Sequence, residues 1–271
     1  MPSPHLRRAD RSALFTSRRA TMLTFVGITL LAWGLRLHQL GAQSLWYDEG
    51  VTATLAQRSL LDLTQWTARD IQPPLYYYVV WGWGRLAGWS EWSLRFVSAW
   101  WGLLAIPLLA ALAQRLARHR LTALITALLT ALHPLLLYYS QEARMYTQLV
   151  TLGILAAYLL LRAGEPGASW QRWLRYGLVA TAAVYTHYFA FFLLLALSVA
   201  LLLDLLASRR AHQPDLLASK RAGQPSPALL RDPALLGCVI THLAILLLYL
   251  AWLGALFQQL TTDRSYWQGR L

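Results

Sequence analysis

The stretch PPLYYYVVWGWGRLAGW, residues 73–89, decides the fold, because its placement fixes the side of the membrane on which every later loop lies. It is shorter than the roughly 20 apolar residues of a membrane span and is rich in Tyr and Trp, which favour the headgroup level. As a span, it would put the loop RLARHR, residues 115–120, outside the membrane, against the positive-inside rule. We therefore expect a helix lying on the membrane surface, which puts that loop inside.

The rest of the chain has the composition of a multi-pass membrane protein. Hydrophobic residues make up 57% of its 271 residues and charged residues only 13%, too apolar a mixture for an ordinary soluble domain. The net charge of +12 lies in short loops beside apolar runs. This pattern argues against a nucleic-acid partner, which binds basic side chains clustered on a polar face. The single cysteine, Cys238, lies within an apolar run, so the sequence holds no disulfide framework.

The apolar runs and the arginines predict an all-α bundle of about seven spans in the plasma membrane. Five arginines precede the first run and place the N-terminus in the cytoplasm. A cleaved signal peptide is the alternative, since small residues follow that run in GAQS. The expected spans are 20–40, 93–114, 121–139, 145–161, 174–188, 189–207 and 234–256.

This topology divides the chain into a basic cytoplasmic segment, residues 1–19, and a transmembrane domain, residues 20–271. Within that domain, residues 41–92 form a long first outer loop. The loop is expected to contain two amphipathic helices on the membrane surface, at roughly 51–68 and 74–88. Residues 208–232, with several Pro, Ala and Ser, are expected to form a flexible cytoplasmic loop.

Two adjacent acids, Asp48 and Glu49 in LWYDEG, residues 45–50, fall in the outer loop. Charged groups near a membrane interior are costly, so an outward-facing pair at a helix end is a candidate for function. A carboxylate at a helix N-terminus can also cap free N–H groups. Capping alone explains one acid more easily than two.

A second outward group is YYSQEARMY, residues 138–146, at the junction of two spans. Glu142 and Arg144 lie there among several tyrosines, and the alternative is an interfacial aromatic belt with a local ion pair. Three further outer residues each have a structural alternative. Asp70 precedes a double proline and can form a turn, Arg95 can snorkel to headgroups, and His187 can be a structural hydrogen-bonding residue.

Together these groups suit an anionic lipid headgroup beside a polar molecule, because arginine neutralises phosphate and a carboxylate can remove a proton from a hydroxyl. Their order along the chain is LWYDE, D-x-x-PPLYY, SE-x-x-x-R-x-x-SA, YYSQEARMY and THYF. This ordered set resembles bacterial members of glycosyltransferase family 39, related to protein O-mannosyltransferases and the lipid A aminoarabinose transferase. The resemblance covers about residues 20–271. It implies a GT-C-like helical bundle with juxtamembrane helices in the first outer loop.

The resemblance also implies an activity: transfer of a sugar, with inversion, from a polyprenyl-phosphate carrier to an acceptor on the outer face of the membrane. By this likeness, Asp48 is the general base and Glu49 binds or orients the acceptor. Arg95, Arg144 and His187 are candidates for contact with the donor phosphate. The secondary acidic or substrate-binding candidates are Asp70, Glu142, Tyr139 and Gln141. No cofactor is certain, and Asp48 and Glu142 are the candidates for a divalent metal ion.

The chain departs from the family in two respects. Relatives often carry His immediately before the double proline, where this chain has Gln72. Family members are also typically longer, so the chain resembles their N-terminal part only.

Two other functions stay open at this point: a transporter or flippase for a lipid-linked sugar, and an inactive membrane scaffold. A transporter predicts broken helices near the bilayer midplane and an internal repeat. The sugar and the acceptor, whether protein, lipid or glycan, are not specified by these residues.

Overall fold

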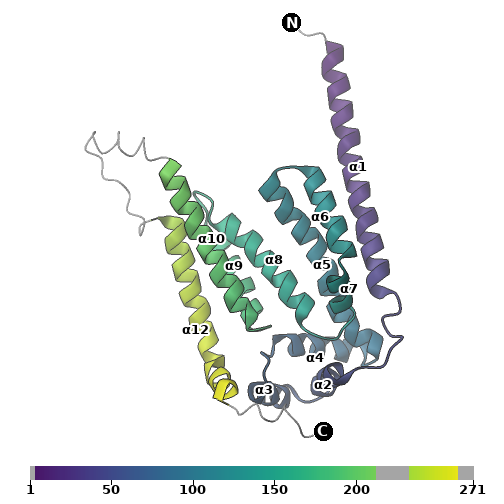
Figure 1. Ribbon diagram of the computed structural model, residues 1–271, viewed down its shortest axis with the longest axis vertical. Helices are drawn as coiled ribbons and strands as arrows, with labels where there is room; N and C mark the ends of the chain where they lie inside the picture. The colour runs from purple at the N-terminus through teal and green to yellow at the C-terminus, as the bar shows by residue number, and fades with distance from the viewer. Residues whose placement is uncertain (1–3, 212–231, 262–271) are drawn as a thin grey trace, which may run out of the picture. The chain divides into compact units, whose positions relative to one another are not determined.

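The structure, a computed structural model, describes residues 4–211 and 232–261, and every regular element in these ranges is a helix (Figure 1). Of the loop expected at 208–232, residues 212–231 lie outside the described residues, and residues 208–211 belong to the last helical turn before them. The helices are α1 (Pro4–Leu37), α2 (Tyr47–Ala56), α3 (Leu60–Arg69), α4 (Leu75–Ala87), α5 (Glu91–Ala117), α6 (Arg120–Leu132), α7 (Pro134–Ser140), α8 (Tyr146–Ala163), α9 (Trp170–Val184), α10 (Phe189–Ala211) and α12 (Pro233–Thr261).

Five of these helices are long and apolar enough to cross a membrane, counting only the described residues: α1 from Arg18 onward, α5, α8, α10 and α12. The bent pair α6 and α7 adds a sixth if the two together form one span. The chain is therefore a multi-pass membrane protein. The expected number of seven spans is not confirmed, because the run predicted at 174–188 is α9, whose 15 residues are fewer than the roughly 20 of a typical span.

The loop predicted at residues 41–92 contains three helices, α2, α3 and α4, where two were expected. The helix predicted over roughly 51–68 is interrupted at Ser59, whose hydroxyl accepts a hydrogen bond from the Asp62 N–H (3.1 Å) and begins α3. An N-cap of this kind satisfies an otherwise unpaired donor and favours a new helix start. The surface helix predicted at 74–88 is α4, and its 13 residues are too few for a span.

The helices form two compact units. The first unit comprises Met1–Ala53 and Trp83–Ile154. The second comprises Thr54–Gly82 and Leu155–Leu271.

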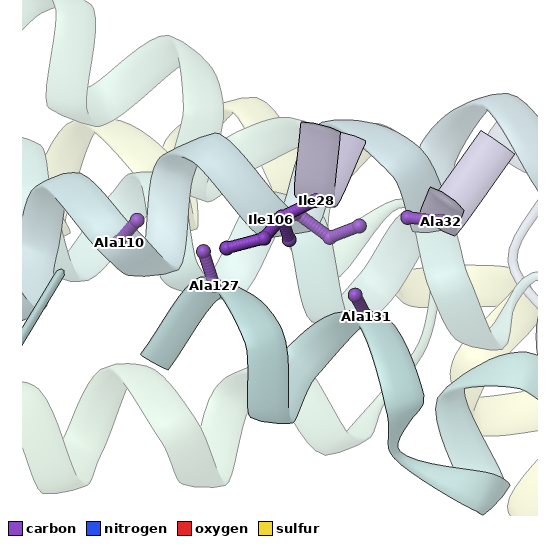
Figure 2. Packing of buried hydrophobic residues seen from close by; sticks show 6 residues of the cluster. All are labelled: Ile28, Ala32, Ile106, Ala110, Ala127 and Ala131. Atoms are coloured by element: carbon purple, nitrogen blue, oxygen red, sulfur yellow. The ribbon is translucent and has the colours of Figure 1, made fainter. Parts of the chain in front are cut away.

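The core of the first unit lies between α1, α5 and α6, which pack on one another. Figure 2 shows Ile28 and Ile106 among the small side chains of one buried cluster. The alanines of that layer are Ala32, Ala110, Ala127 and Ala131. Small residues let membrane helices approach closely. Because lipid tails are themselves apolar, van der Waals packing and not the hydrophobic effect holds these helices together.

A buried arginine stabilises the 56° bend between α6 and α7. Pro134 has no N–H, so the carbonyl of Thr130 lacks the donor that a continuous helix would supply. The Arg36 side chain, 0% exposed, donates to the carbonyls of Thr130 (3.4 Å) and Ala131 (3.2 Å). A cation at the end of a helix is also favoured by the partial negative charge there. Arg36 therefore holds the bend that directs α7 toward the following loop.

The packing of α7 on α5 requires a glycine at position 102. A Cβ atom placed there would lie 2.0 Å from the Ser140 Oγ and 3.3 Å from the Arg36 Nε. Neither neighbour is free to move away, since both are buried. Gly102 thus allows the close approach of α7 to α5.

In the second unit, α9 packs on α10 and on α12, and α3 packs on α12. His242 of α12 links that helix to α9 and α10, since its Nε2 lies 3.2 Å from the Tyr176 hydroxyl of α9 and 3.1 Å from the Ser198 hydroxyl of α10. Gln259, near the other end of α12, donates to the carbonyls of Thr67 (2.9 Å) and Ala68 (3.2 Å) in α3. Hydrogen bonds between side chain and backbone thus fix the last turn of α3 on α12.

Candidate functional site

The two adjacent acids of LWYDEG have different surroundings. They occupy the first turn of α2, where consecutive side chains point about 100° apart. Glu49 is buried completely, whereas the Asp48 side chain is 30% exposed. One of the two carboxylates is therefore accessible and the other is not.

The Glu49 carboxylate is paired with Arg95 of α5 through two hydrogen bonds. The Arg95 Nε donates to Oε1 (2.8 Å) and Nη2 donates to Oε2 (2.7 Å). Such a two-point contact between planar groups is stronger and more directional than a single ion pair. The pair fixes the start of α2 against the first turns of α5.

Arg95 uses every one of its N–H groups inside the protein. Besides the two bonds to Glu49, its Nη1 donates to the carbonyls of Leu40 (3.1 Å) and Gln43 (2.8 Å), and its Nη2 donates to that of Ser44 (3.1 Å). A guanidinium has five N–H donors, and these contacts account for all five. The contacts leave no donor for a phosphate oxygen and make Arg95 a clamp for residues 40–44.

Glu49 also accepts two backbone N–H groups. The N–H of Ala143 donates to Oε1 (2.8 Å), which joins the loop between α7 and α8 to the start of α2. The N–H of Trp46 donates to Oε2 (3.4 Å), the backward contact of a capping box. Glu49 therefore caps α2, as one interpretation of the sequence predicted. Its carboxylate also links the start of α2 to α5 and to the loop between α7 and α8.

Asp48 faces Arg144, with 3.6 Å between Oδ2 and the arginine Nη2. The Asp48 carbonyl accepts from the Thr52 hydroxyl (3.0 Å) and lies 3.5 Å from the Arg144 Nη1. The longer ion-pair distance and the greater exposure leave the Asp48 carboxylate open to a ligand. Of the Glu49–Arg95 and Asp48–Arg144 pairs, the second is therefore the one with an accessible carboxylate.

The loop that carries Glu142 and Arg144 is held by hydroxyl groups. The Ser98 hydroxyl donates to the Arg144 carbonyl (2.9 Å), and the Thr147 hydroxyl donates to the Ser98 carbonyl (2.9 Å). The Tyr139 ring packs on that of Tyr146, with 4.7 Å between centroids. These contacts place the loop against α5.

Glu142 is only 7% exposed, and its surroundings change its acidity. Burial raises the pKa of the Glu142 carboxyl, the Tyr138 hydroxyl opposes this, and the negative charges of Glu49 and Asp48 raise it while Arg144 lowers it. The net effect is a raised pKa. Glu142 is thus a carboxyl that gains a proton at a higher pH than an exposed glutamate.

A cavity of about 610 Å³ lies beside Glu142. Its polar lining includes Glu49, Arg95, Tyr138, Gln141 and Glu142. Because Glu49 and Arg95 bind each other, Glu142 supplies the carboxyl that faces this space. The volume suits a small polar ligand such as a sugar.

Gln141, a predicted substrate residue, has a structural role at the end of α1. Its Nε2 donates to the carbonyl of His38 (2.9 Å) and approaches those of Leu35 and Arg36 (3.3 Å each). These are carbonyls that a helix C-terminus leaves without partners. The amide therefore caps α1 while it lines the cavity.

Asp70 and His187 belong to the second unit. The backbone N–H of Asp70 ends α3 by donating to the carbonyls of Trp66 and Thr67. The His187 Nδ1 accepts from the N–H of Phe189 (3.1 Å) at the start of α10. Their segments are neighbours, since the Leu75 N–H donates to the Tyr185 carbonyl (3.0 Å). The His187 ring thus makes a local structural hydrogen bond, and the role of the Asp70 side chain stays a prediction.

The structure adds one residue that the sequence interpretation missed, Arg36. A charged residue inside an apolar run is costly unless it is paired, and this signal was present in the first predicted span. The predicted metal site at Asp48 and Glu142 is not supported by a cluster of ligand side chains. Among the residues that the structure describes, no three His, Cys, Asp or Glu side chains are grouped to hold an ion.

The chain is similar to known membrane proteins. The profile of the family described as dolichyl-phosphate-mannose-protein mannosyltransferase matches residues 71–218, more than half of the chain. A chain of the S. cerevisiae protein O-mannosyltransferase Pmt1–Pmt2 complex bound to the sugar donor has a TM-score of 0.66 and 17% sequence identity. The similarity covers 90% of this chain and 34% of that one, so this chain spans about a third of its length. No curated protein matches at the same level of significance.

At this low identity the yeast structure is evidence of fold, and it confirms the expected GT-C-like helical bundle. The family profile begins at residue 71 and includes Arg95, Arg144 and His187. It begins after Asp48 and Glu49, so those two acids lie outside the matched residues.

Proposed function

The chain belongs to the dolichyl-phosphate-mannose-protein mannosyltransferase family, and from this membership we propose that it acts in sugar transfer from a polyprenyl-phosphate donor to an acceptor hydroxyl. The observation that carries the proposal is the contrast between the two acids. Glu49 is bound by Arg95 and backbone groups, while Asp48 stays accessible beside Arg144.

The chemistry needs one base and cations near a phosphate. The acceptor oxygen forms a bond to the anomeric carbon as the bond from that carbon to the phosphate oxygen breaks, which inverts the configuration. The hydroxyl proton passes to the Asp48 carboxylate, and the polyprenyl phosphate leaves as an anion that needs no proton. Positioning and charge stabilisation then supply most of the acceleration.

Arg144 is the phosphate contact in this proposal. Its Nη2 lies 3.6 Å from the Asp48 Oδ2, so it can bind the leaving phosphate close to the proposed base. Arg95 takes a different role from the one expected, because its donors are all engaged. We assign Arg95 and Glu49 to positioning Asp48 and the loop of Arg144.

Glu142 and Gln141, which line the cavity, are proposed to contact substrate there. Tyr139 stays a candidate for substrate contact, as do Asp70 and His187 in the second unit. We place the site on the outer face of the plasma membrane, since the opposite loops carry the arginines. Residues 1–19 and 208–232 are then cytoplasmic.

The experiment is transfer from a radiolabelled polyprenyl-phosphate mannose by the purified protein and by Asp48→Asn. Loss of a general base typically lowers a rate by about 10²- to 10⁴-fold, so we expect a decrease of that size with unchanged melting. The matched control is Glu91→Gln, an exposed acid in the first turn of α5. An equal loss in that control would contradict the assignment.

The same assay separates the other two functions. Donor binding without turnover in the unmodified protein would favour a lipid-linked sugar transporter. Absence of both binding and turnover would favour a scaffold. Adding EDTA to an active sample tests whether a divalent metal ion takes part.

A further inference from the structure

A groove lies at the arginine-rich end of the first unit, away from the acids. It occupies about 500 Å³ between α1, α5 and α6. On α5 its lining runs from Pro107 to Gln114, whereas Arg95 lies near the start of that helix. At 1.5 Å per residue, Arg95 and Gln114 are about 28 Å apart, close to the hydrocarbon thickness of a bilayer. The groove and the candidate site therefore lie near opposite membrane surfaces.

Two arginines line the mouth of the groove. Arg18 of α1 and Arg120 of α6 are both exposed, and their side chains make no hydrogen bond or ion pair within the part of the chain described. Arg115 lies in the last turn of α5, and Arg118 lies on the short connection from α5 to α6. Basic side chains near a membrane surface attract anionic lipids.

The floor of the groove is apolar. Met22 and Phe25 of α1 and Leu124 of α6 form its bulkier walls, and Ala111 and Ala123 leave the space between them. Ala110 belongs both to this floor and to the packed layer of Figure 2, so the groove begins where close helix packing ends. An apolar slot of this kind suits an acyl chain.

We propose that this groove binds an anionic phospholipid. The phosphate lies between Arg18 and Arg120, and one acyl chain covers Phe25 and Ala123. The combination of two exposed cations with an apolar floor is complementary to both halves of such a lipid. The assignment does not depend on the proposed sugar transfer. The bound lipid fastens residues 18–25 of α1 to α5 and α6.

The test is native mass spectrometry of the detergent-purified chain titrated with phosphatidylglycerol or phosphatidylcholine. We expect one preferred phosphatidylglycerol adduct, weakened by about 30-fold in Arg18→Gln/Arg120→Gln, since each arginine near an anionic surface favours binding about fivefold. The matched control is Arg58→Gln/Arg175→Gln, which removes two exposed arginines outside the groove. Equal binding of the two lipids, or an equal loss in the control, would overturn the proposal.

A second variant tests the floor with the charges kept. Ala111→Trp fills the slot, and we expect it to weaken the phosphatidylglycerol adduct while the melting temperature in lipid-free detergent is retained. Unchanged binding in this variant would overturn the acyl-chain placement. Displacement of the lipid by sn-glycerol 3-phosphate at equal concentration would assign the groove to a soluble phosphate compound and overturn the lipid assignment.

Discussion

Two acid–arginine pairs lie within one small region of the first unit, and their environments differ. In the Glu49–Arg95 pair the closest atoms are 2.7 Å apart and the side chains are 0% and 6% exposed. In the Asp48–Arg144 pair the distance is 3.6 Å and the Asp48 side chain is 30% exposed. The acids are neighbours in the chain, yet one contributes a rigid support and the other an accessible charge.

The difference between the two pairs has a simple geometric cause. On a helix, residues i and i+1 point in directions about 100° apart, so adjacent side chains meet different neighbours. Glu49 points toward α5 and the N–H of Ala143, whereas Asp48 points toward Arg144. A base is useful only if substrate reaches it, and its position is reproducible only if a neighbouring contact holds the helix.

The largest effect is expected when one member of the buried pair is removed. Arg95→Leu leaves the Glu49 carboxylate buried without its partner, which typically costs about 3–5 kcal/mol. We expect loss of the folded protein or a large drop in melting temperature, measured by fluorescence-detected size exclusion after heating. Arg95→Lys is the control for charge alone, and it should rescue little, because an ammonium cannot make the two-point contact. Full stability in Arg95→Leu would remove the basis of the comparison.

A smaller effect is expected in the coupling energies of the two acid–arginine pairs. In double-mutant cycles that combine Glu49→Gln with Arg95→Gln, we expect a coupling of about 2 kcal/mol in thermal or denaturant unfolding, within the range for groups in one network. For Asp48→Asn with Arg144→Gln we expect about 1 kcal/mol or less, since partly exposed pairs are worth little. Equal couplings would mean that the difference in burial has no energetic consequence.

The smallest effect concerns pH and Glu142. Because the folded-state pKa of this carboxyl is raised, the folded protein binds its proton more tightly than the unfolded chain does. Its contribution to stability is therefore present below the unfolded pKa and is lost as the pH rises through the raised folded pKa. The melting temperatures of the native protein and Glu142→Gln should converge at low pH. Above the raised pKa of Glu142 they should differ, with the variant more stable. A separation of the opposite sign would contradict the assigned cause.

The sequence was a good guide to elements and a poorer guide to partners. Apolar runs predicted the long helices, and the aromatic stretch at 73–89 correctly predicted a helix too short to span, α4. The break at Ser59 was missed, although Ser followed by Asp three residues later is a helix-start signal. The position of Glu142 beside the Asp48–Glu49 region was expected from topology, since all three lie at the same ends of spans.

The roles within the site depended on contacts that are distant in sequence. Arg95 was expected to bind phosphate, but the carbonyls of Leu40, Gln43 and Ser44, about 50 residues away, take three of its donors. Gln141 was expected to bind substrate, and it also caps α1, which ends more than 100 residues earlier. No local pattern encodes such contacts.

By itself the sequence determined the membrane class and the helical architecture, because hydropathy acts locally along the chain. Only the tertiary structure decided which acid of LWYDEG is accessible and which arginine is already occupied. The physical reason is that burial and hydrogen bonding depend on the neighbours that packing provides. In this site those neighbours come from α5 and from the loop between α7 and α8.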